Sequence, residues 1–114
     1  MLVVEDEPLI RMNAVSMVED AGYVAIEAAD ADAAIVILES RDDIRVVFTD
    51  INMPGSMDGL RLARAIRNRW PPIRLIVTSG LIRPKEGEFP ADGRFLPKPY
   101  AADHLAATLR ELAA

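Results

Sequence analysis

The sequence predicts a single α/β domain, residues 1–114, in which helices cover both faces of a five-stranded parallel sheet of strand order 2-1-3-4-5. Short apolar runs alternate along the chain with stretches of helical periodicity, which is the pattern of repeated strand–helix–strand units. Most of these runs are continuously apolar, as in parallel strands that are buried on both faces. At 114 residues, 51% hydrophobic and 27% charged, the chain is long enough to bury one core.

Five apolar runs are the predicted strands. They cover Leu2–Val4, Tyr23–Ile26, Arg45–Thr49, Ile73–Thr78 and Arg94–Leu96. Because strand–helix–strand crossovers are right-handed, the economical arrangement is a doubly wound, flavodoxin-like sheet. Such sheets bind ligands outside the carboxyl ends of the strands, where the strand order reverses. We therefore expect a site between the ends of the first and third strands.

Four helices carry clear start or stop signals. They cover Pro8–Ala21, Ala31–Ser40, Asp58–Arg69 and Ala102–Leu112. Proline suits the opening turn of the first helix, and Gly22 suits its end. Asp30 and Asp58 are N-cap residues by type and position. A further helix is expected within residues 80–94, but Pro84, Gly87, Pro90 and Gly93 interrupt that segment, so this fourth helix should be short or irregular.

Composition excludes several classes of function. The chain has no cysteine, which excludes disulfides and thiolate chemistry. Because it also has only one histidine, it lacks the ligands of the usual zinc sites. Its net charge is −5, and residues 1–58 alone carry −10, which argues against binding of nucleic acid by this domain. No apolar run approaches the ~18 residues of a membrane-spanning helix, and the N-terminus does not resemble a signal peptide. We expect a cytoplasmic protein without membrane contacts.

Three carboxylates follow the two strands that flank the reversal point. Glu5 and Asp6 come directly after the first strand, and Asp50 follows the third. Three carboxylates in one pocket require a neutralising cation. Hard oxygen ligands of this kind suit Mg²⁺, with Mn²⁺ as a substitute.

Two further polar groups are expected at the same edge of the sheet. The fourth strand ends in a hydroxyl, Ser79 or Thr78, and Lys98 follows the fifth strand. A carboxylate nucleophile, a divalent metal, a fixed cation and a hydroxyl donor are the groups that phosphoryl transfer to an aspartate requires.

Four stretches, "VVEDEP", "FTDINMP…MDG", "VTSG" and "LPKP", resemble in order and spacing the receiver domain of bacterial two-component response regulators, the CheY-like superfamily. The resemblance covers nearly the whole chain. It implies that Asp50 is the phospho-acceptor, that Asp6 ligates Mg²⁺ directly and that Glu5 does so through water. It also implies that Asn52 offers its backbone carbonyl to the metal and that Lys98 pairs with the phosphoryl group.

The resemblance further implies a switch. Ser79 would be the hydroxyl drawn toward the phosphoryl group, and Phe95 the aromatic ring that swings inward in response. The bond between Lys98 and Pro99 is commonly cis in the family. The chain departs from the common pattern in having glutamate at position 5, one additional residue in the "MPGSMDG" loop, phenylalanine without a hydroxyl at position 95, and the interrupted fourth helix.

The predicted function is therefore that of a phospho-accepting receiver in a phosphorelay, which takes its phosphoryl group from a histidine kinase or a histidine phosphotransfer protein. Its only chemistry would be its own phosphorylation and slow dephosphorylation, so we class it as a signalling switch and not as an enzyme. The output would be a downstream protein or an output domain outside this chain, and we favour a stand-alone regulator.

Two other functions remain open. One is an interaction module that works without phosphorylation, which failure to bind Mg²⁺ would favour. The other is a small aspartate-nucleophile phosphohydrolase, but Asn52 stands where those enzymes generally carry a second acid.

Overall fold

The computed structural model describes residues 1–51, 58–79 and 93–113. Five parallel strands form one sheet of order β2-β1-β3-β4-β5, as predicted. They are β1 (Leu2–Val4), β2 (Ile26–Ala28), β3 (Val46–Asp50), β4 (Arg74–Ser79) and β5 (Arg94–Pro97). The described helices are α1 (Pro8–Asp20), α2 (Ala31–Ser40), α3 (Gly59–Arg69) and α4 (Ala102–Ala113). The interrupted fourth helix that we predicted lies, apart from residues 93–94, outside the described residues.

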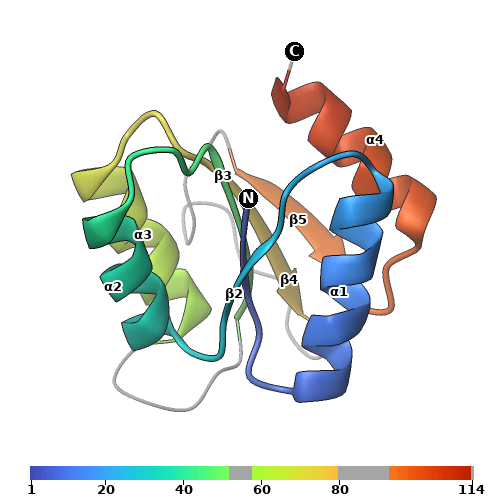
Figure 1. Cartoon of the computed structure of the whole chain (residues 1–114), viewed down its shortest axis with the longest axis horizontal. Coiled ribbons are helices and arrows are strands. Elements are labelled where there is room, and N and C mark those ends of the chain that lie inside the picture. The colour runs from blue at the N-terminus through green and yellow to red at the C-terminus, as the bar shows by residue number, and fades with distance from the viewer. Residues whose placement is uncertain (52–57, 80–92, 114) are drawn as a thin grey trace.

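The sheet lies between two layers of helices, α1 and α4 on one face and α2 and α3 on the other (Figure 1). Each layer has its own core. Leucines of α4 and the buried residues of α1 pack with Phe48 on one face, and buried residues of α2 and α3 pack with Val47 on the other. The inner strands β1, β3 and, after Arg74, β4 are buried on both faces, which is why their sequences are almost continuously apolar, whereas the edge strands β2 and β5 keep exposed residues.

The helix signals act as their residue types suggest. Asp30 accepts a hydrogen bond from the Ala33 amide (2.8 Å) at the start of α2, and Asp58 accepts one from the Arg61 amide (2.9 Å) at the start of α3. Gly22, just past α1, has a φ of 95°, which favours glycine. No helix in the described ranges is long and apolar enough to cross a membrane.

The prediction for the second strand was wrong in its position. We expected Tyr23–Ile26, whereas β2 covers Ile26–Ala28. The pairing of β1 with β2 begins at Leu2 and Ile26, so the residues before Ile26 lie outside the paired strand. Val24 has the β-branched side chain of a strand residue but is 77% exposed. β-branched composition therefore misplaced this edge strand, because pairing with β1 decides where it starts.

Candidate functional site

The structure brings Glu5, Asp6 and Asp50 together at the carboxyl edge of the sheet. β1 and β3 are parallel neighbours, with Val4 paired to Thr49, so the residues that follow them lie side by side. Glu5 and Asp50 are buried, at 4% and 5% exposure. One carboxylate oxygen from each of the three acids lies within 4.8 Å of the others. This geometry follows from the strand order, because β1 and β3 flank the point where that order reverses.

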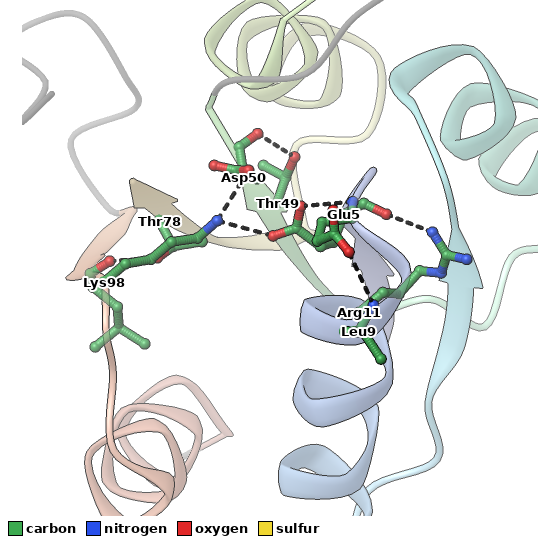
Figure 2. A network of polar contacts seen from close by, with 9 residues as sticks. Glu5, Leu9, Arg11, Thr49, Asp50, Thr78 and Lys98 are labelled. Carbon is green, nitrogen blue, oxygen red and sulfur yellow. Dashed lines mark hydrogen bonds and ion pairs between the residues drawn. The ribbon is translucent and has the colours of Figure 1, made fainter. Parts of the chain in front are cut away.

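Lys98 joins two of these carboxylates. Its Nζ donates to Glu5 Oε1 at 3.0 Å and to Asp50 Oδ2 at 3.1 Å (Figure 2). The Lys98 amide donates to the Ser79 carbonyl at 3.0 Å, which continues the β4–β5 pairing as far as the lysine and fixes where its side chain starts. The peptide bond between Lys98 and Pro99 is cis.

Burial and hydrogen bonding shift the pKa values of Glu5 and Lys98. Burial raises the pKa of Glu5 above its ordinary value, and hydrogen bonds from Lys98 and from the Glu7 amide (3.2 Å to Oε2) only partly oppose this. Burial alone would lower the pKa of Lys98, but hydrogen bonds to Glu5 and Asp50 outweigh it and raise that pKa. Among the residues that the structure describes, one ammonium faces the three carboxylates, so positive charge is in deficit there.

The donor set of this pocket suits a hard divalent cation. Carboxylate oxygens are the ligands that Mg²⁺ prefers, and Mg²⁺ usually keeps several waters while it binds one or two carboxylates. Asp6 is partly exposed and next to two buried acids, so it is open to such an ion. Both oxygens of Glu5 already accept hydrogen bonds, one from Lys98 and one from the Glu7 amide. Asn52, the predicted carbonyl ligand, lies outside the described residues.

The two hydroxyl candidates differ in their surroundings. The Thr78 hydroxyl donates to the Leu96 carbonyl at 2.6 Å. Ser79 is the last residue of β4, is 3% exposed and pairs with Pro97. Because side chains alternate along a strand and Val77 pairs with Phe95, Ser79 and Phe95 lie on the same face of the sheet. Phe95 is partly buried there, against the core formed with α2 and α3.

Gly59 shapes the pocket in a way that sequence reasoning missed. Its amide donates to the Ile51 carbonyl at 2.9 Å, so the start of α3 lies directly against the end of β3. A methyl group at position 59 would overlap the backbone oxygen of Asp50 and would lie 2.8 Å from the Ile51 Cα. The neighbouring Asp58 suggested only a helix start, and nothing local in the sequence indicates this close approach.

Two other residues near the pocket were also missed. Arg11 Nη1 donates to the Glu5 carbonyl at 2.8 Å. The Tyr100 ring packs edge-on against Phe48, with 5.2 Å between ring centroids. Burial raises the pKa of Tyr100 to about 12. In the sequence, Tyr100 could have been placed near the pocket because it lies two residues after Lys98. For Arg11 the sequence offered only its position near the start of the first helix.

Comparison with known proteins identifies the family. The model of the response regulator receiver domain matches residues 1–110. The chain belongs to this family. Receiver domains work in bacterial two-component systems with histidine kinases and downstream output domains, and they bind Mg²⁺ through acidic residues. The acidic group of this receiver domain is Glu5, Asp6 and Asp50.

Individual relatives agree with this assignment. Over 97% of its length the receiver domain is 37% identical to the sensor kinase CckA of Brucella abortus, of which it spans 12%. Over 91% of its length it is 34% identical to the nitrogen assimilation regulatory protein NtrX of Azorhizobium caulinodans, of which it spans 24%. The chain thus spans a small part of these relatives.

Solved structures show the same fold. The receiver domain of the hybrid histidine kinase CckA superposes with a TM-score of 0.81 at 31% identity, covering 99% of this chain and 97% of that one. The receiver domain of NtrX from Brucella abortus superposes with a TM-score of 0.83 at 30% identity, covering 97% and 95%. These relatives confirm the predicted fold class and family.

Proposed function

We propose that Asp50 accepts a phosphoryl group from the phosphohistidine of a histidine kinase or a histidine phosphotransfer protein, in a reaction that requires Mg²⁺ or Mn²⁺. One observation carries the proposal: Lys98 Nζ bridges Glu5 and Asp50, with Asp6 in the same cluster. In the transfer, an oxygen of Asp50 bonds to phosphorus while the bond from phosphorus to the histidine nitrogen breaks, and that nitrogen keeps the electron pair.

Each residue of the pocket then has a defined task. Asp6 would ligate the metal directly, Glu5 through a water, and Asn52 through its backbone carbonyl. The indirect role suits Glu5, whose two oxygens are both hydrogen-bonded within the protein. The bound metal supplies positive charge to the phosphoryl oxygens. Lys98, already 3.1 Å from Asp50 Oδ2, would pair with the transferred group and offset the charge of the product.

The product would act as a switch through Ser79 and Phe95. A phosphoryl group adds about −1.5 to −2 charge and three acceptor oxygens. Ser79, the last residue of β4, would donate its hydroxyl to these oxygens, and Thr78, which pairs with Asp50 across β3 and β4, is the alternative donor. Movement of Ser79 would alter the packing next to Phe95, which lies on the same face one strand away. Two states separated by a few kcal/mol are sufficient for such a population shift.

The output of this switch would be a change of protein contacts. The phosphorylated surface would bind a downstream protein, or an output domain outside this chain, in the cytoplasm. The domain would turn over only its own acyl phosphate, by slow hydrolysis.

The experiment is intact-mass spectrometry after incubation with acetyl phosphate, with and without Mg²⁺, on the wild type and on Asp50→Asn. We expect one phosphoryl addition that requires Mg²⁺ and is absent from the variant. Addition that persists in Asp50→Asn would assign the chemistry to another residue. No addition and no Mg²⁺ binding in the wild type would favour an interaction module that works without phosphorylation.

A further inference from the structure

Arg11 connects three elements around the first acid of the pocket. From the second turn of α1, its Nη1 donates to the backbone carbonyl of Glu5 at 2.8 Å. Its Nε donates to Glu27 Oε1, on β2, at 3.2 Å. Figure 2 shows Arg11 reaching Glu5 from the side opposite to Lys98. The Arg11 side chain is 20% exposed, so it is largely packed against the protein.

The contact falls where the sheet no longer holds the chain. β1 ends at Val4, and the Glu5 amide still donates to the Ala28 carbonyl at 3.1 Å. The Glu5 carbonyl has left the strand pairing, and the Arg11 guanidinium is its donor. This carbonyl and the amide of Asp6 belong to one planar peptide unit, so a contact that fixes the carbonyl also fixes where the Asp6 side chain starts.

We propose that Arg11 is a positioning residue, which aims the carboxylate of Asp6 at the divalent cation through the Glu5–Asp6 peptide. The inference rests on the proposed function, because it concerns the metal that phosphorylation of Asp50 would require. Glu27 holds the guanidinium in place and so acts one step further away. Arg11 itself does not touch the reacting atoms in this arrangement.

Charge and geometry predict opposite effects, which makes the inference testable. Arg11 is a cation near the acidic cluster, and by charge alone it would repel Mg²⁺. If charge were its only effect, Arg11→Gln would bind Mg²⁺ more tightly and Arg11→Lys would bind it unchanged. If Arg11 positions Asp6, both variants bind Mg²⁺ more weakly, because neither side chain reproduces the two-armed fork of the guanidinium.

The test is the Mg²⁺ dissociation constant, measured by calorimetry on the folded wild type, Arg11→Gln and Arg11→Lys. We expect both variants to raise it about 10-fold, the lower end of the effect of residues that orient metal ligands. For Glu27→Gln we expect an increase below about fivefold, since its pair with Arg11 is half exposed. Arg45→Gln is the matched control, since Arg45 is an exposed arginine at the opposite end of β3, and it should leave the constant unchanged.

Two further readouts separate positioning from general damage. In the phosphorylation assay, Arg11→Gln should shift the half-saturating Mg²⁺ concentration about 10-fold, with a plateau rate within about twofold of wild type. In metal-free protein, hydrogen exchange of the Asp6 and Glu7 amides should be faster in Arg11→Gln than in Arg45→Gln. If Arg11→Gln cannot be purified folded, Arg11→Lys and Glu27→Gln carry the same comparison.

The outcomes distinguish this inference from the proposed function. If the wild type takes up phosphoryl with Mg²⁺ but Arg11→Gln has an unchanged or lower dissociation constant, the positioning role is wrong and the proposed function stands. If the wild type neither binds Mg²⁺ nor is phosphorylated, the proposed function is wrong and the inference falls with it.

Discussion

Replacing Lys98 with methionine removes the ammonium from the acidic pocket while it keeps a chain of similar length. The lysine is 21% exposed, and its partners Glu5 and Asp50 are 5% and 6% exposed at their side chains. At separations near 3 Å and an effective dielectric constant of about 20, each pair attracts by about 5.5 kcal/mol. Most of this offsets the cost of taking the charges out of water, and loss of one partner from a buried pair typically costs about 3–5 kcal/mol.

Protonation of Glu5 limits this cost. In the variant, Glu5 avoids an unpaired buried charge when it binds a proton, and binding that proton costs about 1.4 kcal/mol for each pH unit above its ordinary pKa of 4.5. The limit is therefore about 3.4 kcal/mol at pH 7 and about 0.7 kcal/mol at pH 5. Adding about 0.5 kcal/mol for the lost pair with Asp50, we expect Lys98→Met to lose about 4 kcal/mol of unfolding free energy at neutral pH and about 1 kcal/mol at pH 5.

The assay is urea unfolding of metal-free protein at both values of pH, with Lys98→Arg as the control that keeps a cation. Glu5 sets the direction in which stability changes with pH. Because its folded-state pKa is raised, its contribution to stability is fully present below 4.5 and is lost as the pH rises through the folded-state value. A loss that is the same at both values of pH, or below about 0.5 kcal/mol at pH 7, would refute the view that Lys98 holds two buried carboxylates.

Three further predictions follow from the same geometry. Asp6→Asn should stabilise metal-free protein by about 1 kcal/mol, because it relieves repulsion among carboxylates within 4.8 Å, and a destabilised metal-free variant in urea unfolding would contradict this. Gly59→Ala should destabilise by about 2 kcal/mol despite the helix propensity of alanine, because its methyl would overlap the backbone of Asp50; a raised urea midpoint would contradict the close approach. In Tyr23→Phe, which leaves Tyr100 as the only tyrosine, the phenol should titrate at about 12 in an absorbance titration, and folded protein that titrates near its ordinary 10 would show that the ring is not buried.

The close approach of the site residues was predictable, because they lie at the carboxyl ends of strands. In a parallel sheet the carboxyl ends of the strands share one edge, so the order 2-1-3-4-5 alone places Glu5, Asp6 and Asp50 together. Lys98 was predicted at the same edge because it follows the fifth strand. Four short motifs at those strand ends then indicated the family, which the match over residues 1–110 confirms.

What sequence reasoning missed depends on contacts between elements. Gly59 carries no local mark of its approach to Asp50, since that approach depends on how α3 packs against β3. Arg11 reads as one of many helix-surface arginines until α1 is placed beside β1 and β2. The start of β2 was misplaced because pairing of Ile26 with Leu2, and not local composition, sets it. Local patterns thus predicted the elements, and tertiary contacts decided their ends and supports.

The most direct measurement of the central claim locates the phosphoryl group within the chain. Protein incubated with acetyl phosphate and Mg²⁺ is treated with borohydride, which reduces an acyl phosphate but not a free carboxylate, and its peptides are sequenced by mass spectrometry. We predict that the side chain at position 50 alone carries a hydroxymethyl group in place of its carboxyl group, and that omission of Mg²⁺ abolishes this. Reduction at Glu5 or Asp6, or equal labelling without Mg²⁺, would contradict the assignment of Asp50 as the acceptor of this pocket.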